Sequence, residues 1–95
     1  MFDLKLLAHA EDEFSEAFDW YQKQQTGLGK KFFTEVNQQL TLIEANPYHY
    51  PIRYANVLHA VPVKKFPFII IYWVDDAKQQ IVVASIFHTS RQPKY

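Results

Sequence analysis

Thr26-Gly27-Leu28-Gly29 holds both glycines of this 95-residue chain and separates two segments of helical periodicity. The upstream apolar stripe consists of Ala10, Phe14, Ala17, Phe18 and Tyr21. The downstream stripe consists of Phe32, Phe33, Val36, Leu40 and Ile43. Gly27 can adopt the left-handed conformation that ends a helix near Gln25, and Asn46-Pro47 ends the second helix. The pattern therefore predicts an antiparallel pair of helices.

Segments with the composition of β-strands flank these two helices. Phe2 to Leu6 alternates apolar and charged residues, and residues 57–63, 68–74 and 80–87 are rich in β-branched and aromatic side chains. Residues 48–56 have no period and are expected to form a loop. The order predicts an α+β fold, βααβββ, in which the helical hairpin covers one face of a mostly antiparallel four-stranded sheet. The other face, here termed the open face, is expected to stay partly uncovered.

Length and composition narrow the class of protein further. With 48% hydrophobic and 21% charged residues, we expect one folded domain over residues 1–95. Cysteine is absent, which excludes disulfides and Cys-ligated zinc, and the four histidines lack metal-ligand spacing, so no metal or cofactor is expected. The longest apolar run, Phe68 to Val74, is too short to span a membrane, and no signal peptide is apparent. These features favour a cytoplasmic protein with no membrane partner.

The net charge of zero hides an uneven distribution. Residues 1–50 carry eight acids against four lysines, whereas residues 51–95 carry six basic residues against two acids. Contact with a polyanion is therefore expected to be local to the C-terminal half. The acidic run Glu11-Asp12-Glu13 lies opposite the apolar stripe of its helix, and we interpret it as a solvated face.

A set of polar residues is expected near the open face, contributed by the last strands and the tail. These candidates are His59, Lys64, Lys65, His88 and Arg91, joined by Arg53, Lys94 and Tyr95. A guanidinium and ammonium groups suit a phosphate, and a histidine can exchange a proton near neutral pH, so together they could cleave RNA without metal. Residues of these types at strand ends are also common as surface groups or loop anchors.

Several motifs, in register over nearly the whole chain, closely resemble the RelE/ParE toxin superfamily of bacterial type II toxin–antitoxin systems. The motifs are Trp20-Tyr21, Gly27-Leu28-Gly29, Asn46-Pro47, Lys65-Phe66-Pro67-Phe68 and Phe87-His88-Thr89-Ser90-Arg91-Gln92-Pro93. The resemblance implies the βααβββ fold and a cognate antitoxin protein, through which alone operator DNA is bound. It also implies that the antitoxin folds along the groove beside the helices and along the unpaired sheet edge.

The superfamily has two activities, and both remain open for this chain. RelE-like members cut mRNA on the ribosome, whereas ParE-like members poison DNA gyrase. The Gly27-Leu28-Gly29 motif and the tail from His88 to Pro93 look more like the ParE-like branch, often called plasmid stabilisation proteins, which favours gyrase. A metal-independent endoribonuclease would rest on His88 and Arg91 as catalytic residues, with the other candidates binding the target. Many relatives carry strand arginines where this chain has His59-Ala60, which weakens that alternative. A third alternative is a non-toxic relic that only binds antitoxin.

Overall fold

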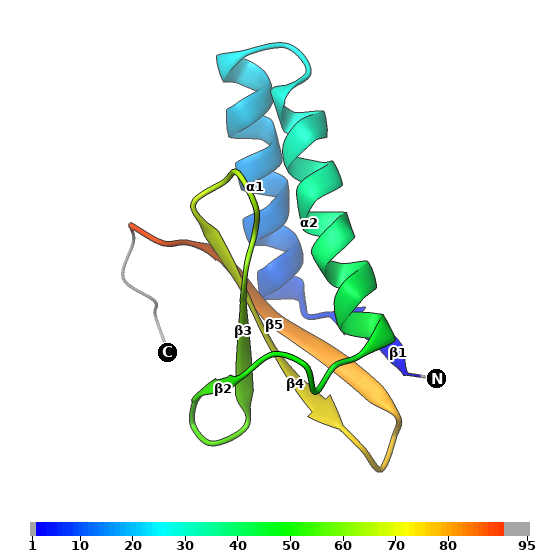
Figure 1. Cartoon of the computed structure of the whole chain (residues 1–95). Coiled ribbons are helices and arrows are strands. Elements are labelled where there is room, and N and C mark those ends of the chain that lie inside the picture. Colours follow the sequence, from blue (N-terminus) through cyan, green and yellow to red (C-terminus); the bar gives the residue numbers. More distant parts are fainter. Residues whose placement is uncertain (1, 91–95) are drawn as a thin grey trace.

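The computed structural model describes residues 2–90, in which two helices lie against one face of a sheet (Figure 1). The elements in chain order are β1 (Asp3–Leu6), α1 (Ala8–Gln24), α2 (Leu28–Ala45), β2 (Ile52–Tyr54), β3 (Leu58–Pro62), β4 (Phe68–Asp75) and β5 (Gln80–His88). The helices run antiparallel, as the two apolar stripes predict. The α+β class and the helical hairpin on one sheet face are thereby confirmed.

The sheet has five strands in the order β1-β5-β4-β3-β2, rather than the four expected. Strand β1 pairs with β5 in parallel, and the other neighbours are antiparallel. The additional strand is β2, which lies in the segment that we expected to be a loop. The strand has only three residues, all of them exposed, so it is too short to mark a strand by its sequence pattern and has no buried face.

Pro62 ends β3 at a position where its missing N–H removes no hydrogen bond between strands. It lies opposite Ile69 of β4, whereas β2 pairs with β3 only at Leu58 and His59. The other side of β3 is therefore a sheet edge at Pro62, and no neighbouring strand requires the N–H that proline lacks.

The link between the helices depends on both glycines. Gly27 has φ of 90°, a left-handed conformation that glycine adopts without strain. Gly29 donates its backbone N–H to Oε1 of Gln22 at 3.1 Å, and a Cβ at Gly29 would lie 2.9 Å from the carbonyl oxygen of Phe18. The absence of a side chain at Gly29 therefore lets α2 begin in direct contact with α1.

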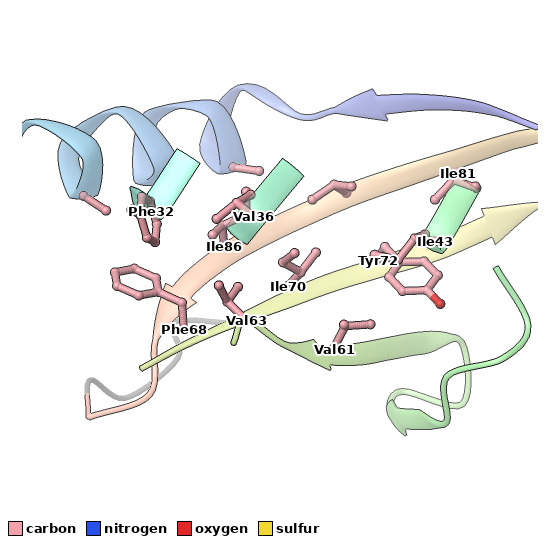
Figure 2. Close-up of a cluster of buried hydrophobic side chains, with 13 residues drawn as sticks. Phe32, Val36, Ile43, Val61, Val63, Phe68, Ile70, Tyr72, Ile81 and Ile86 are labelled. Carbon is pink, nitrogen blue, oxygen red and sulfur yellow. The ribbon is translucent and has the colours of Figure 1, made fainter. Parts of the chain in front are cut away.

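The core lies between the helices and the sheet, with Phe32 of α2 at its aromatic centre. Figure 2 shows Phe32 beside Phe68, with the aliphatic part of the core extending from there toward Ile43 and Tyr72. Phe32 has no exposed surface. Its ring centroid lies 4.9–5.5 Å from those of four other aromatic residues. These neighbours are Phe14, Tyr21, Phe66 and Phe68.

The two glycines predict different responses to alanine. Gly29→Ala should lower the free energy of unfolding by about 1–3 kcal/mol, because the methyl group would press on the α1 backbone. Gly27→Ala should cost about 1 kcal/mol, because open space surrounds Gly27 and only its positive φ is strained. Urea unfolding of both variants measures the difference; equal losses would contradict the proposed close contact at Gly29.

Candidate functional site

Three of the candidate residues gather at one end of the sheet, where the β3–β4 turn meets the end of β5. The Thr89 N–H donates to the Pro67 carbonyl at 2.8 Å, which joins the two segments. Lys64 and Lys65 are exposed on the turn, and His88 ends β5. We call residues 63–68 and 87–90 the His88 end of the sheet.

The environment of His88 defines its hydrogen-bonding role. Its Nδ1 accepts the backbone N–H of Ser90 at 3.2 Å and lies 2.6 Å from the Ser90 Oγ. Because a backbone N–H can only donate, a neutral His88 carries its proton on Nε2. The outward nitrogen of the neutral ring is therefore a hydrogen-bond donor, suited to an anionic oxygen, and not a proton acceptor.

The structure corrects the expected position of His88 relative to the two sheet faces. His88 lies opposite Phe68 in the β4–β5 ladder, with ring centroids 5.1 Å apart. Phe68 packs against Tyr21 and Phe32 of the helices, and paired residues point to the same side of a sheet. His88 is therefore half-buried on the helix-covered side, at the margin of the sheet, instead of on the open face.

Apolar residues, rather than cations, form the centre of the open face. Alternation along β4 places Ile69, Ile71 and Trp73 there, and Phe87 lies opposite Ile69. Ile71 has no exposed surface, and Phe87 is buried. Both faces of the central strands are thus apolar, which accounts for the uninterrupted run from Phe68 to Val74, a pattern typical of strands buried on both sides. Among residues 2–90, the expected gathering of cations on this face is not found.

His59 also differs from its expected position, because it lies in the core layer under the helices. It is 6% exposed and stacks on the Tyr72 ring at 4.8 Å with an interplanar angle of 8°. Its Nδ1–H donates to the Tyr50 carbonyl at 2.7 Å. His59 pairs with Tyr72 in the β3–β4 ladder, and this register directs its side chain inward. The residue anchors the segment after α2 and offers little surface to a target.

A buried phenol completes this anchor. The Tyr72 hydroxyl donates to the Pro47 carbonyl at 2.6 Å, and burial raises the pKa of the Tyr72 phenol well above its usual value, with a smaller contribution from Tyr50. The Tyr50 hydroxyl lies 3.4 Å from Oε1 of the buried Gln39. These contacts hold residues 46–51 against the core, so the segment is ordered although it has no regular structure.

The remaining candidates do not join His88 in the part of the chain that the structure describes. Arg53 is exposed on β2, which pairs with β3 at His59, and the β3–β4 ladder places His59 opposite Tyr72. His88 lies opposite Phe68, which is four residues from Tyr72 along β4. It belongs to β5, which lies on the other side of β4 from β3. Arg91, Lys94 and Tyr95 lie outside the described residues.

The acidic run on α1 has a role that the sequence interpretation missed. Oε1 of Glu13 accepts hydrogen bonds from the Ile86 N–H at 2.9 Å and from the Ser85 hydroxyl at 2.7 Å, and it lies 3.3 Å from Nε2 of His9. Strand β1 pairs with β5 only as far as Val83. Beyond Val83, β5 has no strand neighbour on this side, so the outward-facing Ile86 amide needs another acceptor. The carboxylate of Glu13 is that acceptor.

Neither a metal cluster nor a spanning helix is found among residues 2–90. No three histidine, aspartate or glutamate side chains lie together in an arrangement that could hold an ion. Within the same range, no helix combines the length and the apolar character needed to cross a bilayer.

Comparison with solved structures shows which proteins share this fold. A chain from the chromosomal ParDE toxin–antitoxin system of P. aeruginosa superposes with a TM-score of 0.78 at 17% identity, over 95% of this chain and 98% of that one. The isolated E. coli RelE toxin gives a TM-score of 0.66 at 15% identity, over 97% of this chain and 88% of that one. A chain of the intact E. coli RelBE toxin–antitoxin complex gives 0.67 at 15% identity, over 96% and 100%. The fold is that of the RelE/ParE toxins.

The sequence identifies the family within this class. Residues 4–93 match the family described as ParE toxin of type II toxin-antitoxin system, parDE, and the chain belongs to that family. No curated protein matches the sequence. The resemblance drawn from the motifs is thus confirmed. Toxins of this family belong to type II toxin–antitoxin systems, in which each toxin has an antitoxin partner.

Tyr72→Phe should lower the free energy of unfolding near neutral pH by about 1–3 kcal/mol, because the Pro47 carbonyl loses its buried donor. The raised pKa means that folding favours the protonated phenol; this contribution is fully present below the ordinary pKa of 10.0 and is lost as pH rises further. The stability gap between the native chain and the variant should therefore narrow above pH 10.0. Urea unfolding across this pH range tests the prediction, and a gap independent of pH would contradict it.

Proposed function

We propose that this chain arrests growth by binding DNA gyrase, as the ParE-like branch that it resembles does, and that an antitoxin neutralises it. The observation that carries the proposal, beside family membership, is the hydrogen bonding of His88. The neutral ring presents Nε2–H, and its Nδ1 accepts a hydrogen bond from Ser90. It therefore has no free basic nitrogen that could take the proton from an attacking ribose hydroxyl. A donor of this kind serves in binding.

The target-contacting surface that we propose centres on the His88 end of the sheet. Lys64 and Lys65 project from the turn, and Arg91, Lys94 and Tyr95 follow in the sequence. Arg53 would contact the target from the distant β2 edge. We assign His59 to the support of residues 46–51, because its side chain is buried between Tyr72 and the Tyr50 carbonyl.

The antitoxin would cover apolar surface that the helices expose. Trp20 of α1 and Phe33 of α2 are each about half exposed, and Leu42 extends the exposed apolar surface of α2. An amphipathic partner segment that folds on binding would bury these side chains. Exposed Ile52 on the β2 edge offers a second contact, at backbone groups that another strand could pair.

The alternative of an endoribonuclease keeps one supporting observation. His88 and two lysines share one end of the sheet, so a phosphate held by Lys64 or Lys65 would lie in the same region as an imidazole. In that case His88 and Arg91 would be the catalytic residues, with a protonated His88 acting as an acid through Nε2. A chain that binds antitoxin without arresting growth is the third possibility.

The two activities are separable in cell-free assays with the purified chain. The chain should inhibit supercoiling by gyrase while leaving translation and mRNA intact in an extract. Lys64→Ala with Lys65→Ala should weaken the inhibition about tenfold, because two charges that face the target are lost. Lys78→Ala, in the exposed β4–β5 turn, is the matched control.

Co-expression with the antitoxin should restore growth. Ribosome-dependent mRNA cuts that disappear in His88→Ala would establish the nuclease instead. Absence of growth arrest together with antitoxin binding would identify the non-toxic form.

A further inference from the structure

A cavity opens between the first turn of α2 and the β3–β4 turn, on the helix side of the His88 end. It encloses about 610 Å³ and is lined by lysines from both segments, namely Lys30, Lys31 and Lys65, and by the ring of Phe66. The charge distribution along the sequence did not suggest this grouping, because two of these lysines belong to the half with a net negative charge. Folding brings them next to Lys65.

Positive charge exceeds negative charge in this cavity. Glu35, whose side chain is 14% exposed, lies 3.5 Å from the ammonium of Lys65. Among residues 2–90, neither Lys30 nor Lys31 forms an ion pair. Three ammonium groups and one carboxylate leave a formal charge of +2 around the space.

The two unpaired lysines lie where a helix disfavours them. The first turn of α2 contains Lys30 and Lys31 and no acid, whereas α1 has Glu11 in its first turn and Lys23 in its last turn. Cations near a helix N-terminus are repelled by the dipole, so α1 has the stabilising arrangement of charge and α2 has the opposite one. Lysines that oppose helix stability at the mouth of a cavity are explained if they bind an anion.

We propose that this cavity binds a phosphate-bearing ligand through the ammonium groups of Lys30, Lys31 and Lys65. A phosphate dianion matches the local charge of +2, whereas a single carboxylate does not. The Leu28 and Gly29 amides are occupied by the Gln25 carbonyl and the Gln22 side chain, so binding relies on the lysine side chains.

The size and lining of the cavity limit the chemical class to which the rest of the ligand can belong. Its volume is that of a small-molecule site and leaves room beyond a phosphate. Phe66 provides an apolar wall there, because its ring is half-buried against Tyr21 and Phe32. A nucleotide or a segment of a nucleic acid strand combines a phosphate for the lysines with a base that can lie against Phe66. The inference is independent of whether gyrase is the target.

The test is an NMR titration of the full chain with pyrophosphate, adenosine triphosphate and a short single-stranded DNA. All three should shift the amide signals of residues 27–31 and 64–66, with affinity falling as salt rises. Tighter binding of the triphosphate would indicate a free nucleotide as the source, and tighter binding of the strand would indicate nucleic acid.

Lys30→Gln combined with Lys31→Gln should weaken pyrophosphate binding at least about tenfold, because charge-assisted contacts to phosphate are lost. Lys78→Gln, on the remote β4–β5 turn, should bind as the native chain does. The double variant should also be at least as resistant to urea, because repulsion with the α2 dipole is relieved. A merely structural role for these lysines predicts lower stability.

Three results would overturn the proposal. They are unchanged pyrophosphate affinity in the double variant, amide shifts that extend equally to Lys78, and binding of an oligoglutamate peptide as tight as that of pyrophosphate. The last would assign the cavity to an acidic protein segment. Because these titrations contain no gyrase and no antitoxin, their failure would leave the outcome of the gyrase assay open.

Discussion

The packing of Phe32 against four other aromatic rings is the interaction on which the fold and the His88 end of the sheet depend. Phe14 and Tyr21 belong to α1, Phe66 to the β3–β4 turn and Phe68 to β4, so one buried side chain of α2 joins all the segments that meet there. Deleting such a ring from a core costs about 3–5 kcal/mol in other proteins. In a chain of 95 residues without disulfides, that is a large share of a typical stability of about 5–15 kcal/mol.

This aromatic centre also relates the two surfaces to which we assign function. Phe68 contacts the ring of His88, and Phe66 lines the lysine-lined cavity, so the aromatic cluster touches both surfaces. The β3–β4 turn contributes to both surfaces: Lys64 and Lys65 belong to the proposed target contact, and Lys65 also lines the cavity. A rigid aromatic cluster beneath flexible lysines suits binding, because the positions of the charges are set before a partner arrives.

The sequence pattern was sufficient to predict both helices from their apolar stripes, the turn from Gly27, β1 from its alternation, and β3, β4 and β5 from their β-branched and aromatic composition. It could not predict β2, whose residues are all exposed, or the hydrogen bonds of Glu13, which depend on β5 extending beyond β1. The side chains of His59 and His88 point to the helix side because of strand register, which a single sequence does not reveal. The cavity was missed for a related reason: Lys31 and Lys65 are far apart in sequence and become neighbours only through the packing of Phe66 on Phe32.

Amide hydrogen exchange of Phe32→Leu, compared with Phe33→Leu, tests whether the Phe32 ring holds the His88 end of the sheet. Phe33 is adjacent in sequence but 48% exposed, so Phe33→Leu makes the same chemical change at a position that is not in the buried core. Phe32→Leu should speed exchange at the Val63 and Thr89 amides, which donate to the Phe68 and Pro67 carbonyls. The increase should be smaller at the Leu7 amide, which donates to the Val83 carbonyl between β1 and β5. Phe33→Leu should leave all three amides protected. Equal effects of the two variants, or uniform loss of protection at all three amides in Phe32→Leu, would contradict the claim that this ring holds the His88 end of the sheet in place.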